Sequence, residues 1–70
     1  MRNITVTPGT KLEQLLKLAD LVGSGGEAKL EIQDGAVAVN GKTELRRGYK
    51  VKDGDIVTID GESIEVSIQQ

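Results

Sequence analysis

The chain has 70 residues, enough for one domain and too few for a second hydrophobic core. It contains neither Cys nor His, which excludes disulfides and the usual zinc ligand sets. Its net charge of −2 argues against a general polyanion binder but leaves room for a local basic surface. No apolar run reaches the length of a membrane span and the N-terminus lacks an apolar signal core, so we expect a cytoplasmic protein without a membrane partner.

The charge is divided unevenly along the chain. Residues 41–52 carry five basic side chains against Glu44 alone, whereas residues 53–70 carry five acidic side chains and no basic one. A surface built from the first of these segments would attract a polyanion locally even though the whole chain is weakly acidic. Residues 41–52 are therefore the first candidate for an interaction site.

Two elements are predicted before residue 24. Residues 3–7 alternate between apolar and polar side chains, which predicts a half-buried strand at the edge of a sheet. Leu and Ala then recur at helical spacing over residues 11–21 and predict the first helix. Thr10 and Glu13 form a T-x-x-E capping box at its start, and Gly23 is expected to close it in the left-handed conformation.

Residues 24–36 fit two structures. Ser24 and Glu27 form an S-x-x-E box that would begin a second helix, with Ala28 and Ile32 on its inner face. Residues 29–33 also alternate strictly and precede Asp34-Gly35, a pattern typical of a hairpin with a type I′ turn. The pattern alone leaves both structures open, although the good helix formers in the segment favour the helix.

The remainder of the chain is predicted to form short strands. Residues 37–39 and 42–45 make a hairpin around Asn40-Gly41, the strongest hairpin turn in the chain. Residues 46–52 are expected to be irregular, with Tyr49 and Val51 as anchors. The last hairpin pairs residues 56–59 with residues 64–68 through Asp60-Gly61.

Three stretches occur in a fixed order: KLEQLLKL at residues 11–18, SGGEAKLEIQDGAVAVNGK at residues 24–42, and VKDGDIV at residues 51–57. Together they resemble the RNA-binding S-four (S4) domain, named after small-subunit ribosomal protein four. The resemblance covers about residues 11–59. The GGEAK signature and the Arg46-Arg47-Gly48 that follows look most like the small stand-alone bacterial members of the YaaA and YbcJ type.

The resemblance implies an α+β fold, in which two helices pack on a small sheet of short, mostly antiparallel strands, as a single domain over residues 1–70. It resolves residues 24–36 in favour of a helix and implies that the helix pair and the adjoining loop bind structured RNA. Ribosomal RNA is the expected target, with a ribosomal or RNA-processing protein as a further partner. The expected RNA-binding residues are Lys11, Ser24, Lys29, Lys42, Arg46, Arg47 and Lys50.

One position departs from the family pattern. Many members place an Arg directly after the capping Ser, where this chain has Gly25, so one phosphate contact is missing. Exposed Gly amides at a helix start can themselves bind phosphate. Arg46 and Arg47 are adjacent and, in an extended segment, point to opposite faces, so one of them is expected to pair with the acidic C-terminal region.

The residue types exclude several kinds of chemistry. The chain has no nucleophile–base pair in sequence, so we expect neither an enzyme nor a cofactor. The carboxylates of residues 53–62 lie in hairpin turns without EF-hand spacing, so no metal site is expected. Tyr49 is the only aromatic residue, which leaves little scope for base stacking and favours folded RNA over single strands.

A β-grasp protein-interaction module is the main alternative. Small sulfur-carrier proteins also show V-x-V-N-G, a downstream Arg and D-G-D before a late strand, but they end in Gly-Gly. This chain reads SIQQ at residues 67–70, so we expect no carrier chemistry. A strand over residues 27–33 would favour the β-grasp fold and a helix there the S-four fold. A further alternative is that the acidic residues 53–70 dock a basic protein.

Overall fold

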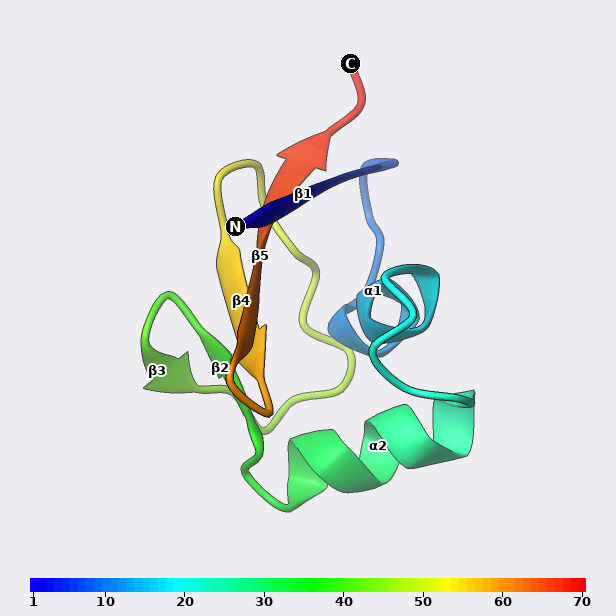
Figure 1. Cartoon of the computed structure of the whole chain (residues 1–70). Helices are drawn as coiled ribbons and strands as arrows, with labels where there is room; N and C mark the ends of the chain where they lie inside the picture. The colour runs from blue at the N-terminus through cyan, green and yellow to red at the C-terminus, as the bar shows by residue number, and fades with distance from the viewer.

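The computed structural model describes residues 1–70 and places two helices against one face of a five-stranded sheet (Figure 1). The elements in chain order are β1 (Arg2–Val6), α1 (Leu12–Leu18), α2 (Gly25–Gln33), β2 (Val37–Val39), β3 (Lys42–Thr43), β4 (Ile56–Ile59) and β5 (Glu62–Ile68). The strand order is β1-β5-β4-β2-β3, with β1 and β5 parallel and the other pairs antiparallel. The predicted α+β fold is therefore confirmed. Neither helix is long and apolar enough to cross a membrane.

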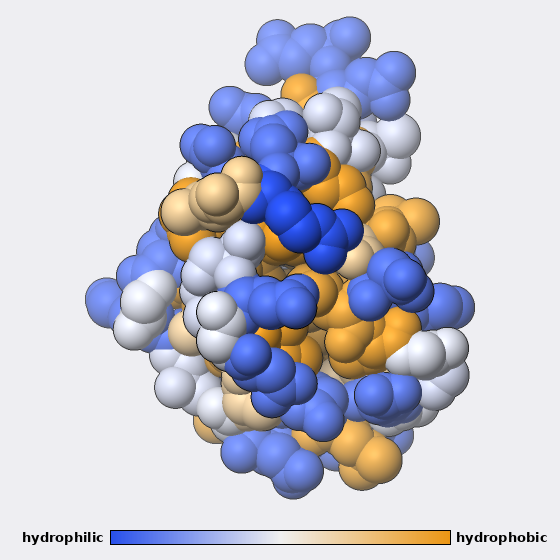
Figure 2. Space-filling view, in the orientation of Figure 1, coloured by the Kyte–Doolittle hydropathy of each residue, from blue (hydrophilic) through white to orange (hydrophobic).

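The hydrophobic core lies between the sheet and the helices. Alternate residues of the strands point toward α1 and α2, because side chains of a strand alternate between its two faces. The side chains with the least exposure are Leu12, Leu15, Leu16, Ala28 and Ile32 on the helices, Ala19 directly after α1, and Val37, Val57, Ile59, Ile64 and Val66 on the strands. Figure 2 shows hydrophobic residues between the two layers, surrounded by hydrophilic side chains. This packing fixes which helix faces remain outside, and those faces carry the basic residues.

The start of α1 differs from the prediction. Lys11, not Thr10, is the N-cap, and its backbone N–H donates to Oε1 of Gln14 at 2.9 Å. The Thr10 hydroxyl donates instead to the carbonyl of Thr7 at 2.8 Å, and Thr10 is buried. The predicted Thr10–Glu13 capping box is therefore wrong, because the turn before the helix uses the Thr10 hydroxyl.

The end of α1 also differs. The helix stops at Leu18, with Ala19 as its C-cap, and Asp20 adopts the left-handed conformation (φ 58°) that was expected of Gly23. Asp tolerates this region better than most residues with a Cβ atom. Ala19 and Val22 are nevertheless buried, which explains why the apolar spacing predicted a helix reaching residue 21.

Residues 24–36 form a helix and its flanks, so the hairpin alternative is wrong. The Ser24 Oγ accepts the N–H of Glu27 at 3.1 Å, and a carboxylate oxygen of Glu27 accepts the N–H of Gly23 at 2.9 Å. Ala28 and Ile32 are fully buried on the inner face of α2. Gly35, with φ at 81°, lies directly after the C-cap and reverses the chain into β2.

Two tight turns follow the prediction. Asn40 and Gly41 have φ values of 54° and 83°, and positive φ at both central residues is what a type I′ hairpin turn requires. Asp60 and Gly61 repeat the arrangement with 50° and 79°. The strand expected over residues 42–45 is shorter, since β3 ends at Thr43, although the N–H of Glu44 still donates to Val37 O at 3.0 Å.

Candidate nucleic-acid interface

The segment 44–52, called the basic loop below, lies against the start of α1. The carbonyls of Tyr49 and Arg47 accept the backbone N–H groups of Leu12 and Glu13 at 2.7 and 3.2 Å. The N–H of Val51 donates to Thr10 O at 3.0 Å. Because the first N–H groups of a helix have no partner within the helix, the loop supplies acceptors that α1 itself lacks. The basic loop is therefore fixed beside the helix pair.

Asp55 anchors the same loop from the sheet side. Its Oδ2 accepts the Tyr49 hydroxyl at 2.7 Å and the Lys52 N–H at 2.9 Å, and its Oδ1 accepts the side-chain amide of Asn40 at 3.0 Å. Burial acts to raise the pKa of Asp55, but the hydrogen bonds from Tyr49, Lys52 and Asn40 outweigh it and hold that pKa below its ordinary value. The bond to Asp55, together with burial, raises the pKa of Tyr49 to about 12.

A shallow depression, called the helix hollow below, lies where α1, α2 and the basic loop meet. No hydrophobic residue lines it, and it carries three cations against one carboxylate. The lining residues are Glu13, Gln14, Lys17, Gly25, Gly26, Lys29 and Arg47. A Cβ atom placed on Gly25 would lie 3.9 Å from Cδ of Lys17, so this lysine extends directly alongside the start of α2.

Two of the residues that line the helix hollow have an unpaired backbone donor. The N–H groups of Gly25 and Gly26, the first two of α2, donate to no acceptor within the protein, whereas the Ser24 hydroxyl and carbonyl take the next two. Free N–H groups at a helix start, together with nearby cations, suit a phosphate oxygen. Gly25, at the position where many family members have an Arg, therefore offers a backbone N–H donor in place of the missing side chain.

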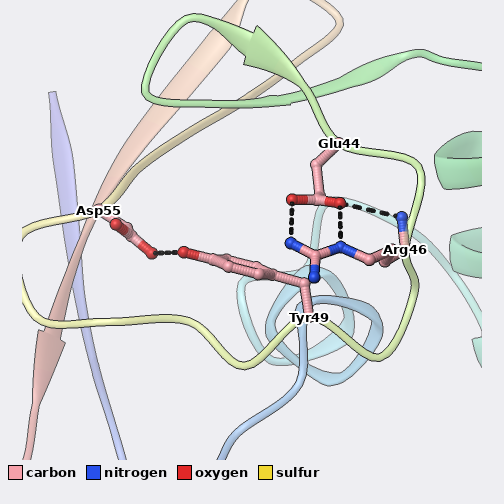
Figure 3. A network of polar contacts seen from close by, with 4 residues as sticks. All are labelled: Glu44, Arg46, Tyr49 and Asp55. Carbon is pink, nitrogen blue, oxygen red and sulfur yellow. Dashed lines mark hydrogen bonds and ion pairs between the residues drawn. The ribbon is translucent and has the colours of Figure 1, made fainter.

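A second depression, called the loop hollow below, is formed by the basic loop itself. Its lining residues are Arg46, Gly48, Tyr49, Lys50 and Lys52. Neither Arg46 nor Arg47 forms an ion pair with the acidic C-terminal region, so the expectation that one of them does is wrong. Arg46 pairs with Glu44, two residues before it, through Nε–Oε2 and Nη2–Oε1 contacts of 3.0 and 3.2 Å (Figure 3). The side-chain hydrogen bond from Arg46 holds the pKa of Glu44 below its ordinary value.

The structure distributes the expected RNA-binding residues over several places. Lys29 and Arg47 meet in the helix hollow, and Arg46 and Lys50 meet in the loop hollow. Lys11 pairs with Lys50 through an isolated antiparallel bridge at the base of the loop. The adjacent arginines thus line different hollows, although they lie in a turn closed by the Tyr49 N–H, which donates to Arg46 O at 3.2 Å, and not in an extended segment.

The other two expected residues lie apart from these hollows. Ser24 uses its hydroxyl as the cap of α2, and Lys42 lies on β3 and lines neither hollow. Two further cations line the hollows although they are not among the expected RNA-binding residues: Lys17 lines the helix hollow and Lys52 lines the loop hollow. Gln14 and Lys17, both in the lining of the helix hollow, are three positions apart and lie on the same face of α1. This spacing is the feature of the sequence from which the position of Lys17 could have been predicted.

Comparison with known proteins gives one family and several relatives. The S4 domain matches residues 5–67. RlbA of Bacillus subtilis, whose name refers to ribosome maturation, is 48% identical over 50 residues, covering 71% of this chain and 70% of its own. YbcJ of Escherichia coli, whose name refers to RNA binding, is 39% identical over 59 residues, or 84% of each chain.

Solved structures agree with the fold. The solution structure of E. coli YbcJ, described as revealing an ALFAL motif involved in RNA binding, superposes with a TM-score of 0.73 at 35% identity over 96% of this chain and 87% of that one. The 30S ribosomal protein S4e of Thermoplasma acidophilum gives a TM-score of 0.56 at 35% identity. That match covers 74% of this chain and 26% of the larger ribosomal protein.

Proposed function

This chain belongs to the S4 domain family, and from that premise we propose that it is a non-catalytic protein that binds structured RNA. The binding face in this proposal is made by α1, α2 and the basic loop. The observation that carries it is the helix hollow, which is lined by Lys17, Lys29 and Arg47 together with Gly25 and Gly26, whose backbone N–H groups have no acceptor within the protein. Cations next to unpaired amide donors are the groups that bind phosphate.

The mode of binding follows from the kinds of group present. Phosphate contacts give affinity that depends strongly on salt and reads little sequence. The core and the hydrogen bond to Asp55 hold Tyr49, so no aromatic ring is free to stack along a single strand. The proposed ligand is therefore a folded RNA whose backbone follows the protein surface.

We propose ribosomal RNA as the target within that class. The support is the name of RlbA, which refers to ribosome maturation, and the likeness to a ribosomal protein of the small subunit. A ribosome-associated role in the bacterial cytoplasm, with ribosomal or RNA-processing proteins nearby, belongs to the same proposal. The β-grasp alternative has no support, because residues 27–33 are helical where that interpretation needed a strand.

Salt-dependent binding tests the proposal directly. A labelled RNA hairpin is titrated with the protein at several salt concentrations, and log K is expected to fall linearly with log salt. Replacing Lys29 and Arg47 together by Ala should weaken binding and reduce the slope by roughly 0.7–0.9 for each phosphate that the variant no longer binds. Lys42→Ala is the control for loss of charge outside both hollows; it removes one positive charge where the double variant removes two, so it should change the slope by far less than half as much. Equal binding and equal slope for wild type and the double variant would disprove the proposed face.

A further inference from the structure

Arg46 is held in one place although it lies at the surface. Its Nε and Nη2 contact the Glu44 carboxylate, and its backbone N–H donates to the same carboxylate at 3.1 Å. Its guanidinium carbon lies 5.4 Å from the centre of the Tyr49 ring. Figure 3 shows the guanidinium between these two partners. An arginine side chain ordinarily loses considerable rotamer freedom when it binds a ligand. The Arg46 side chain is already fixed in the free protein, so less of this entropy is lost on binding.

The two partners of Arg46 are themselves fixed. The Glu44 side chain is only 16% exposed, and its backbone N–H donates to Val37 at the start of β2. The Tyr49 ring packs on the hydrophobic core, and its hydroxyl is bonded to Asp55. The position of Arg46 is thus set by the sheet and the core, although the residue itself lies in a loop.

The charge of Arg46 is largely neutralised, but its side chain remains accessible. Glu44 neutralises the guanidinium locally, which makes Arg46 a weaker phosphate ligand than Lys50 or Lys52 in the same hollow. The Arg46 side chain is nevertheless 73% exposed. A carboxylate that pairs side-on occupies an edge of the guanidinium within its plane and covers neither broad face. The Tyr49 ring lies on one side, so the opposite side is the one open to a ligand. What Arg46 presents to a ligand is therefore a flat, weakly hydrated surface.

We propose that the Arg46 guanidinium, held by Glu44 beside Tyr49, is a stacking platform for one unpaired nucleobase of the bound RNA. Bases splayed from a folded RNA stack on arginine planes as well as on aromatic rings. Lys50 and Lys52 lie in the same hollow and take the phosphates on either side of that base. This inference rests on the proposed function and narrows its ligand to a folded RNA with a bulged or looped-out nucleotide.

Three hairpins test it: one with a single bulged adenosine, one with an abasic site at the bulge, and one fully paired. The wild type is expected to bind the bulged hairpin roughly fivefold or more tightly than its abasic counterpart, the size of a stacking contact. Arg46→Lys keeps the charge and removes the plane, so the preference should disappear. Glu44→Gln removes the neutralising charge, so affinity for all three hairpins should rise while the preference shrinks.

Arg47→Lys is the matched control, because it makes the same change at the adjacent residue, which lines the other hollow. It should alter the affinity for the three hairpins by a common factor and leave the preference intact. Equal binding of the bulged and abasic hairpins by the wild type would overturn the platform alone. If the wild type binds none of the three at low salt, the proposed function fails and the platform with it. Circular dichroism of each variant verifies that it is folded.

Discussion

The Tyr49 hydroxyl donates a 2.7 Å hydrogen bond to Oδ2 of Asp55, which joins the middle of the basic loop to the turn before β4. Asp55 is buried, and its other oxygen accepts from Asn40 at the tip of the β2–β3 hairpin. One carboxylate thus connects the loop, the hairpin and the central sheet. The shape of the proposed RNA-binding face depends on this connection as well as on the basic residues.

Asp55→Ala should destabilise the fold. It leaves the Tyr49 hydroxyl, the Asn40 amide and the Lys52 N–H without their acceptor, and we expect a loss of about 2–3 kcal/mol in the free energy of unfolding. Urea denaturation followed by circular dichroism measures it. Glu62→Ala is the control, since Glu62 is exposed and its side chain makes no hydrogen bond or ion pair. A loss no larger than that of the control would show that the network contributes nothing to stability.

Tyr49 should titrate abnormally, and as the only tyrosine it can be observed directly. Its folded pKa of about 12 lies above the ordinary value of 10.0, so the unfolded chain loses the phenol proton first as the pH rises. The stabilisation from this group is fully present below pH 10.0 and is lost as the pH rises through about 12. Phenolate absorbance of the folded protein should show the higher midpoint, and the urea-unfolded chain the ordinary one. Identical midpoints would contradict the hydrogen bond to Asp55.

Ser24→Ala should separate capping from RNA binding. The Ser24 hydroxyl already accepts the Glu27 N–H, so its loss should cost about 1 kcal/mol of stability while the affinity for RNA is unchanged. Ser24→Asp keeps a capping acceptor and should retain the stability. A drop in RNA affinity for Ser24→Ala at a temperature where it remains folded would show that Ser24 contacts the RNA.

Arg46 and Arg47 should contribute differently to phosphate binding. The double replacement of both by Ala should weaken binding to structured RNA several-fold without unfolding the domain, because both side chains are exposed. Of the two single variants, Arg47→Ala should reduce the salt slope more, since Glu44 already neutralises Arg46. Filter binding over a series of salt concentrations compares the slopes. Equal slopes for the two single variants would show that the Glu44 pair opens when RNA binds.

Local chemistry made much of the fold predictable. The residue types of Asn40-Gly41 and Asp60-Gly61 predict a type I′ turn, because few other residue pairs adopt positive φ at two successive positions. Ser24 and Glu27 likewise form their cap within a single turn of chain. Each of these features depends on residues close together in sequence, and each was confirmed.

The start of α1 and the role of Asp55 depend in part on contacts from elsewhere in the chain. The Thr10 hydroxyl bonds to Thr7 while its carbonyl accepts the N–H of Val51, so Lys11 caps α1. Asp55 was interpreted only as part of a turn, because its partners Asn40 and Tyr49 are brought to it by the sheet. The candidate site was predictable as a basic segment. Its division into two hollows was not, because Lys17 and Lys29 reach it from the helices.

The pairing of β1 with β5 has a consequence for how this protein folds. Asn3 meets Ser67 across that pair, 64 positions along the chain, and β5 lies between β1 and β4 in the sheet. The helix pair and the β2–β3 and β4–β5 hairpins are local and can form early, whereas β1 must wait for a distant partner. Until β1 pairs with β5, the facing edges of these two strands are exposed to other chains. We therefore expect the pairing of β1 with β5 to be the slow step of folding and the stage most prone to aggregation.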